Sequence, residues 1–305
     1  MKYNFWKVIV TIVTLIMTIT QIVIMCDNNR IIKNQTYLIE ASKEANYSAE
    51  FLNIIGLVGQ ETQSDSYTID SIKNQNIIFG FDLSSDFDVL NCSVDSLSVK
   101  LSPNLKNRIA SFTNYILPYP VVSEEGRLSN KSYSPERRKL LIYLINSYAD
   151  LNNMLFDAKF SNIKLDNFDI RNRCLRGLNM NNSYLDKCNF YKCNLSAANF
   201  DESLLKTTAF RYCNLIPCDF KNTILDVVSF EHSCLPYAIH FKGAKIEHIN
   251  LEDAIVPGED WLDEMKVYLK DIGNLNDYEI SKYPCDTLCH NTTRQILFYK
   301  VNFKK

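Results

Sequence analysis

The sequence predicts a mainly β chain in which residues 151–256 wind into a four-sided helix of short strands. Three observations lead to this prediction: an apolar residue returns at every fifth position, the residue two places before it is mostly small, and residues twenty apart are alike. A period of five fits neither an α-helix, with a period of 3.6, nor a strand, with a period of 2. The apolar series runs Phe160, Leu165, Ile170, Leu175, Met180, Leu185, Phe190, Leu195, Phe200, Leu205, Phe210, Leu215, Phe220, Leu225, Phe230, Leu235 and, after one extra residue, Phe241, Ile246, Leu251, Val256.

A turn of about a right angle after each unit explains this period. Four units then close a square of twenty residues, and successive coils stack roughly 4.8 Å apart with backbone pairing as in a parallel sheet. The series predicts about five coils. Arg173 and Leu178 occupy inward positions where small residues are expected, so we expect irregular first coils. The extra residue beside Pro236 predicts a bulge.

A small residue, then Asn or Asp, then Leu or Phe recurs along this segment, as in Cys188-Asn189-Phe190 and Ala198-Asn199-Phe200. This pattern resembles that of the pentapeptide-repeat family and covers about a third of the chain. The resemblance implies a right-handed quadrilateral β-helix with a narrow core.

Residues 1–28 are interpreted as a transmembrane signal anchor. Residues 8–25 are uncharged, and at 1.5 Å per residue they span roughly 27 Å, close to the ~30 Å hydrocarbon core of a bilayer. A cleaved signal peptide would have a shorter apolar core and small residues at the cut, whereas this run ends Met25-Cys26. The lipid bilayer is therefore the expected partner of residues 8–25.

The side of the membrane stays open. Lysines precede the apolar run and basic residues follow it in nearly equal number, so the positive-inside rule decides little. The ten cysteines favour a reducing compartment, since four of them occupy inward positions of the coil. A lone N-terminal anchor more commonly has the opposite orientation. We expect a bacterial plasma membrane protein and lean towards a cytoplasmic soluble part.

Residues 29–62 form the predicted membrane-proximal helix. Apolar residues recur at near-heptad spacing, at Ile31, Leu38, Leu52 and Ile55 among others. This spacing is compatible with a coiled-coil stalk that dimerises the chain or with an amphipathic helix that lies on the rest of the protein.

Residues 63–150 are predicted to be a mixed, largely helical cap. Ser102-Pro103 and Ser134-Pro135 each supply an N-cap hydroxyl and a first-turn proline, so a helix is expected to begin at each. The second helix runs into the first coil, and we expect it to cover that open end.

Residues 257–305 are predicted to cap the other end, with a helix from about Trp261 to Gly273 and a strand over residues 295–303. The order of anchor, Ser-Pro helices and repeats is similar, more loosely, to bacterial membrane-anchored pentapeptide-repeat proteins of unknown role.

Candidate chemical sites are few. Cys285, Cys289 and His290 form a C-x₃-C-H cluster without a fourth ligand at a suitable spacing, so no metal and no cofactor are predicted. A metal-binding or enzymatic activity at this cluster stays an alternative.

Three histidines at intervals of eight, from His232 to His248, lie on different sides of the coil. Cys193 and Cys213 stack within range of a disulfide, but core packing is the preferred interpretation. Without a catalytic motif, we expect neither an enzyme nor a small-molecule substrate.

The resemblance also implies one known activity, the protection of DNA gyrase by an acidic rod that imitates duplex DNA. Residues 158–256 contain twelve Lys and Arg against eleven Asp and Glu, so this coil lacks the required negative charge. Nucleic acid is not expected as a partner, and gyrase binding remains the alternative function.

The leading hypothesis is a membrane-anchored, non-enzymatic scaffold for an unidentified protein partner or for further copies of the chain. Leu204, Ala209 and Ile224 are apolar residues at outward positions, each one place before an inward residue. They mark the predicted protein-contact strip.

Overall fold

The computed structural model describes residues 47–62, 98–122, 128–282 and 299–304, with scattered helical residues between 17 and 42. The chain divides into two compact units. The first spans Met1–Ser48 and Tyr119–Ser132 and includes most of the hairpin formed by β1 (Tyr119–Val122) and β2 (Leu128–Tyr133). The second spans Ala49–Pro118 and Tyr133–Lys305 and contains the repeats.

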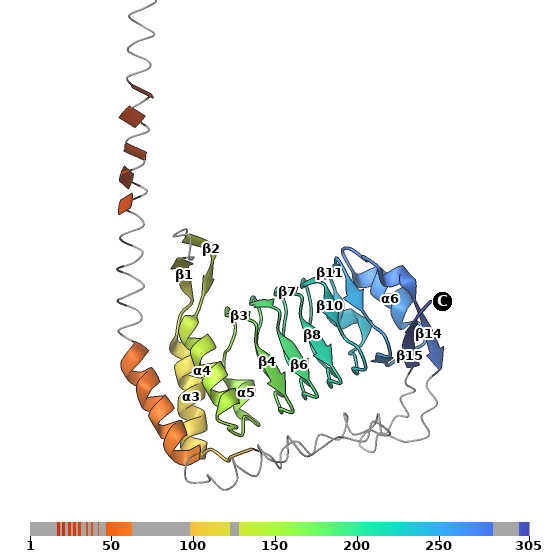
Figure 1. The fold of residues 1–305 in the computed structure, drawn as a ribbon, viewed down its shortest axis with the longest axis horizontal. Helices are drawn as coiled ribbons and strands as arrows, with labels where there is room; N and C mark the ends of the chain where they lie inside the picture. The colour runs from red at the N-terminus through yellow and green to blue at the C-terminus, as the bar shows by residue number, and fades with distance from the viewer. Residues whose placement is uncertain are drawn as a thin grey trace, which may run out of the picture. The chain divides into compact units, whose positions relative to one another are not determined.

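The second unit is built on a solenoid of short parallel strands (Figure 1). One side stacks β3 (Lys164–Asp166), β5 (Tyr184–Asp186), β7 (Leu204–Lys206), β9 (Ile224–Asp226) and β11 (Lys245–Ile246). The next side stacks β4 (Asp169–Arg171), β6 (Asn189–Tyr191), β8 (Ala209–Arg211), β10 (Val228–Ser229) and β12 (Ile249–Asn250). Isolated parallel bridges join successive coils on the two remaining sides. The predicted mainly β, four-sided coil is confirmed.

The solenoid makes about four turns, where the sequence predicted about five coils. Leu165 pairs with Leu185, Leu185 with Leu205, Leu205 with Leu225, and Leu225 with Ile246, which gives four steps between the first and last strand of this sheet. The sequence count included both end levels. The helix α5 (Met154–Asp157) precedes the first level, and the strands of the last level have only two residues.

Two further expectations are corrected. The extra residue before Phe241 forms the 3₁₀ helix η2 (Ala238–Phe241) rather than a bulge, so a helical turn outside the strand ladder absorbs it. The first coils are regular, since β4 pairs with β6 in full register. Arg173 fits because its guanidinium leaves the open end of the coil and donates to the carbonyl of Ala149 at 2.7 Å.

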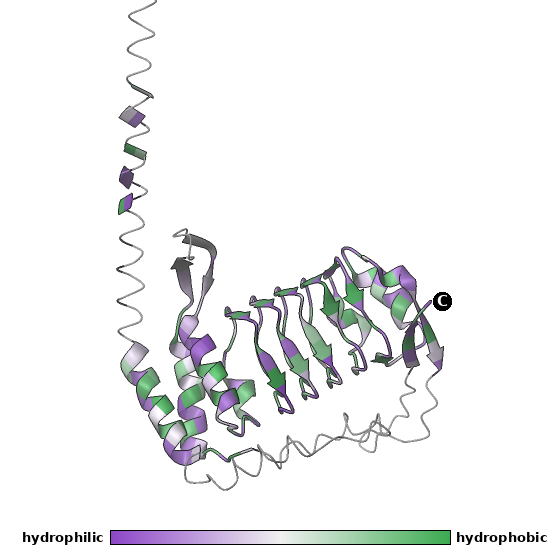
Figure 2. Ribbon diagram, viewed as in Figure 1, coloured by the Kyte–Doolittle hydropathy of each residue, from purple (hydrophilic) through white to green (hydrophobic). Residues whose placement is uncertain are grey.

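Two stacks of phenylalanine rings fill the core. Phe190, Phe210 and Phe230 stack face to face with centroids 4.9 and 5.4 Å apart. Phe200, Phe220 and Phe241 form the second stack, at 5.4 and 5.0 Å, and the two stacks meet edge-on. Both geometries suit the ring quadrupole. Figure 2 shows the hydrophobic and hydrophilic residues that alternate along the coils.

The small inward residues also link neighbouring coils. The Ser203 hydroxyl donates to the carbonyl of Met180 and the Ser233 hydroxyl to that of Phe210, each at 2.9 Å and each 23 residues earlier in the chain. The Cys213 thiol makes the same contact with Phe190 at 3.3 Å. Cys193 and Cys213 are both buried and do not form a disulfide, as core packing requires.

Helices cover the first coil. Both Ser-Pro predictions are confirmed, because α3 (Pro103–Tyr115) and α4 (Pro135–Asn146) begin at these prolines with capping hydroxyls from Ser102 and Ser134. Residues 49–62 are helical and pack on this cap through buried Ile54 and Val58. Residues 49–62 therefore lie on the rest of the unit, as one of the two alternatives predicted, while most of residues 29–46 lies outside the described residues.

At the other end, α6 (Trp261–Tyr268) ends five residues before Gly273, where the predicted helix was expected to stop. The predicted strand appears as β15 (Tyr299–Phe303), between β13 (Ile255–Val256) and β14 (Tyr278–Lys282) in an antiparallel arrangement with both. The sequence did not predict β14. The short 3₁₀ helix η3 (Leu275–Asp277) leads into it.

The predicted anchor at residues 8–25 lies largely outside the described residues. Among the residues that are described, no helix combines the length and the apolar character needed to cross a bilayer.

Candidate interaction surface

The outer side of the β3–β11 sheet carries one column of residues in direct register. Lys164 pairs with Tyr184, Tyr184 with Leu204, Leu204 with Ile224, and Ile224 with Lys245. The three central side chains are half-buried, so each presents part of its surface to solvent. We name Tyr184, Leu204 and Ile224 the apolar strip. It is three coils long and bounded by a lysine at each end.

The structure brings together two of the three predicted contact residues. Leu204 and Ile224 are neighbours, whereas Ala209 lies on β8 in the adjacent sheet, in register with Asn189. Residues on adjacent sides face different directions, so Ala209 is not part of the apolar strip. Sequence reasoning missed Tyr184, although its position twenty residues before Leu204 was the signal that would have found it.

An acidic margin runs beside the apolar strip. Two residues further along the same strands, Asp166, Asp186, Lys206 and Asp226 form a second column in register. The Oδ1 atom of Asp186 is buried and has no hydrogen-bond partner. Burial, followed by the charges of Asp186 and Asp166, raises the pKa of Tyr184 above its ordinary value. Because three of these four residues are carboxylates and one is a lysine, the margin on balance favours cationic groups on anything that covers the strip.

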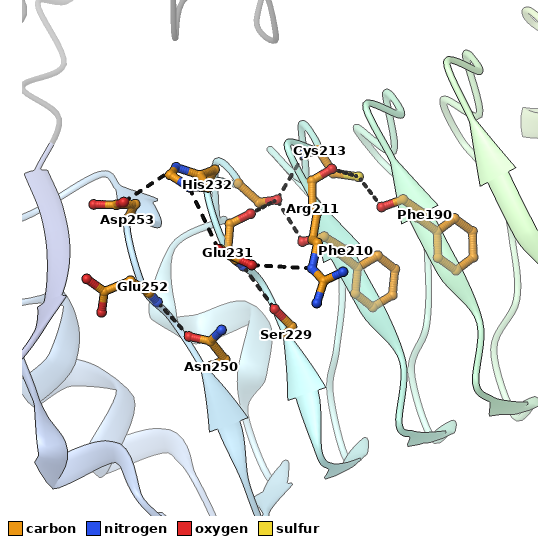
Figure 3. A network of polar contacts seen from close by, with 11 residues as sticks. Phe190, Phe210, Arg211, Cys213, Ser229, Glu231, His232, Asn250, Glu252 and Asp253 are labelled. Carbon is orange, nitrogen blue, oxygen red and sulfur yellow. Dashed lines mark hydrogen bonds and ion pairs between the residues drawn. The ribbon is translucent and has the colours of Figure 1, made fainter. Parts of the chain in front are cut away.

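A second surface follows the corner of the solenoid after the β4–β12 sheet (Figure 3). We name it the charged corner. Its first three turns carry three cations and two tyrosines, and its last two turns carry three carboxylates and one histidine. In chain order these residues are Arg171, Tyr191, Lys192, Arg211, Tyr212, Glu231, His232, Glu252 and Asp253.

Rings and cations alternate along this corner. The Lys192 ammonium lies 5.6 Å and 6.0 Å from the ring centroids of Tyr191 and Tyr212, and burial lowers the pKa of Lys192. Tyr212 in turn stacks on His232 with centroids 4.6 Å apart. Such cation–π contacts hold the lysine head close to the wall of the solenoid.

The acidic end of the corner is tied by ion pairs. Arg211 Nε lies 3.3 Å from Glu231 Oε2, and His232 Nδ1 lies 3.6 Å from Asp253 Oδ2. Lys300 from β15 also pairs with Asp253. At the other end, Arg171 pairs with Asp169 at 2.7 Å. Side chains at this corner are part exposed, so each pair contributes less than about 1 kcal/mol to stability.

The histidines make separate contacts on different sides of the solenoid. His232 pairs with Asp253, while His240 Nδ1 lies 2.8 Å from Asp219 Oδ1 on another side of the solenoid. Within the described part of the chain, no group of three His, Cys, Asp or Glu residues is arranged to hold a metal ion. The cluster of Cys285, Cys289 and His290 lies outside the described residues.

Residues 175–206 match the protein-family model described as pentapeptide repeats, with eight copies. No curated protein matches the chain. Among solved structures, the chain is similar to a trypsin-treated form of QnrB1, a plasmid-mediated fluoroquinolone resistance protein, at 15% identity over 30% of this chain and 52% of that chain, with a TM-score of 0.17. It thus spans about half the length of that QnrB1 chain.

The chain is also similar to the pentapeptide repeat protein Rfr23 from the cyanobacterium Cyanothece 51142, at 14% identity over 30% of this chain and 78% of that chain, with a TM-score of 0.16. Because both TM-scores are low, neither structure carries an argument about function. The matched residues and the register of the solenoid agree with the five-residue pattern of the sequence, and the chain therefore carries pentapeptide repeats.

Proposed function

We propose that the chain is a non-enzymatic scaffold that binds a protein partner on the apolar strip and is tethered to a membrane by residues 8–25. The observation that carries this proposal is the direct register of Tyr184, Leu204 and Ile224 on the outside of the solenoid. Every coil is paired to its neighbours, so the strip is rigid before binding. A rigid surface loses little conformational entropy when a partner docks.

The strip and its margin define the chemistry of the partner. A matching surface has apolar side chains at a spacing of about 4.8 Å, one for each coil. It also carries lysine or arginine side chains on one flank, where Asp166, Asp186 and Asp226 lie. The partner is therefore a protein segment that is apolar along one line and basic beside it.

The tether and its orientation belong to the same proposal. The uncharged run of residues 8–25 supports the tether. None of the six described cysteines is in a disulfide, and several donate to backbone carbonyls, which supports the cytoplasmic side of a bacterial plasma membrane. A membrane-impermeant thiol reagent tests this, with one exposed cysteine added near the C-terminus. Labelling of that cysteine in intact cells, before lysis, overturns the cytoplasmic assignment.

The strip is tested with Leu204→Lys combined with Ile224→Lys in the full chain. We expect proteins that co-purify with the unmodified chain after cross-linking in cells to be lost from this variant. Val267→Lys is the matched control, because Val267 is 79% exposed on α6, away from the strip. Circular dichroism confirms that both variants keep the solenoid. The same set of cross-linked proteins on all three chains refutes the role of the strip.

A further inference from the structure

We propose that the charged corner is a self-association surface, on which a second copy of this chain binds in the antiparallel direction. This inference goes beyond the proposed function, because the charged corner lies on a different side of the solenoid from the apolar strip and takes a different partner. Three steps lead to it: the order of charges, the register that this order selects, and the size of the contact.

Positive and negative side chains are separated along the charged corner. Strand register places Arg171, Tyr191 and Arg211 on successive coils, and Glu231 follows on the next one, where it meets Arg211. Among the nine residues of the charged corner, the three cations thus come from the first three turns and the three carboxylates from the last two, while Asp169 pairs with Arg171 and Lys300 pairs with Asp253 beside them. A surface with this order is complementary to itself when one copy is reversed, as a two-fold dimer requires.

The charges also select the position of the two-fold axis. An axis between the third and fourth turns, perpendicular to the solenoid, places Arg211 opposite the partner's Glu231. The same axis places Lys192 opposite the partner's Asp253, and Tyr212 opposite the partner's His232. The Arg211–Glu231 and Lys192–Asp253 contacts join opposite charges, and each occurs twice; within one chain Asp253 also pairs with Lys300.

Other arrangements bring like charges together. An axis through the third turn places Arg211 opposite the partner's Arg211. A parallel arrangement sets the cations of one copy against the cations of the other, and like charges at an interface are unfavourable. The reversed arrangement between the third and fourth turns pairs Arg211 with Glu231 and Lys192 with Asp253, and it sets no like charges opposite each other.

The size of the corner predicts a weak dimer. Four steps of about 4.8 Å give a contact about 19 Å long, and one corner is narrow, so the buried area stays below the roughly 1,000 Å² of a stable complex. The attraction is therefore largely electrostatic. Salt shortens its range from about 10 Å at 0.1 M to about 3 Å at 1 M, so we expect the dimer at low salt only.

The test is a charge exchange between two full-length chains with different affinity tags, mixed in detergent at 50 mM salt. Lys192→Glu and Asp253→Lys each place like charges opposite each other in a homodimer. Together, in a mixture of the two variants, they restore both pairs. The backbone tolerates both changes, because Glu202, Lys187, Lys192 and Asp253 all adopt φ between 53° and 59° at equivalent corners.

We expect each variant alone to show at least tenfold less co-capture than the unmodified chain, and the mixture to recover it. Lys187→Glu is the matched control, since Lys187 is an exposed lysine on the same coil with the same φ of 53°. The Leu204→Lys, Ile224→Lys chain should co-capture normally, which separates this inference from the proposed function. No co-capture by the unmodified chain, equal co-capture by all chains, or a mixture that fails to recover would each overturn the inference.

Discussion

The indole ring of Trp261 lies edge-on against the phenyl ring of Phe241, with centroids 6.0 Å apart and planes at 89°. Trp261 also donates its Nε1 hydrogen to the carbonyl of Pro236 at 2.8 Å. Since Phe241 is the last ring of one core stack, Trp261 closes that stack and fastens α6 over the end of the solenoid.

Replacing Trp261 with alanine should therefore open the end of the core. Trp261 is 1% exposed, and truncation of a buried aromatic side chain costs about 3 to 5 kcal/mol. We expect this loss in the free energy of unfolding from urea denaturation followed by circular dichroism. Val267→Ala on the same helix is the control and should change stability by less than about 0.5 kcal/mol. Equal effects of the two substitutions would mean that α6 does not seal the core.

Replacing Arg137 with lysine should destabilise the folded chain. The buried guanidinium of Arg137 donates to the carbonyls of Thr113, Ile116 and Ser161 at 2.9, 2.6 and 3.0 Å, and so joins the end of α3 to the first coil. A lysine ammonium lacks the planar fork that reaches all three, and unsatisfied buried carbonyls cost about 1 to 3 kcal/mol each.

We expect Arg137→Lys to lower the free energy of unfolding by about 2 to 4 kcal/mol. Arg171→Lys is the control, because that side chain is 59% exposed, and it should have almost no effect. A lysine variant with unchanged stability would show that the first coil does not depend on this contact.

Replacing Val227 with asparagine should make the folded chain more stable. Val227 adopts φ 55° at a corner, where a β-branched side chain is strained, and it is 50% exposed. Asparagine accepts this conformation, as Asn222 does on the same coil. We expect Val227→Asn to raise the free energy of unfolding by about 1 kcal/mol, measured by urea denaturation. Val267→Asn, an exposed valine in a helix, should give no gain, and a loss at position 227 would contradict the prediction.

Cys188 and Cys218 should resist thiol reagents in the folded chain. Burial raises the pKa of Cys188 to about 12, and burial followed by the charges of Asp219 and Asp201 raises the pKa of Cys218 well above its ordinary value. At pH 8 almost all of the Cys188 side chain is therefore the unreactive thiol. Maleimide labelling with peptide mapping should find both unmodified in buffer and modified in denaturant. Labelling of either thiol in the folded chain at pH 8 would contradict their burial.

Much of the fold was predictable because the repeat is local. A five-residue unit has one inward large residue, so the position of Leu185 in the core follows from its place in the series. The end caps were harder to predict from the sequence. Ser102 and Ser134 mark helix starts through their own hydroxyls, but β14 pairs with residues 299–303, about twenty positions away, and no local sequence pattern predicts such a pairing.

The candidate surfaces were less predictable. Leu204, Ala209 and Ile224 have the same outward position in their units, yet two lie together and the third lies on another side. Tyr184 joins the strip only through the register of β5 with β7. The charged corner escaped sequence analysis because its residues are spread over five coils.

The sequence by itself determined the period, the inward residues and the start of each capping helix, since these depend on neighbours a few positions apart. Only the tertiary structure decided that Arg173 leaves the coil end, that Trp261 closes the phenylalanine stack, and that Arg211 and Asp253 lie along one corner. The physical reason is that these contacts join residues brought together by the stacking of coils, and the number of coils and the shape of the ends appear only once the chain has closed on itself.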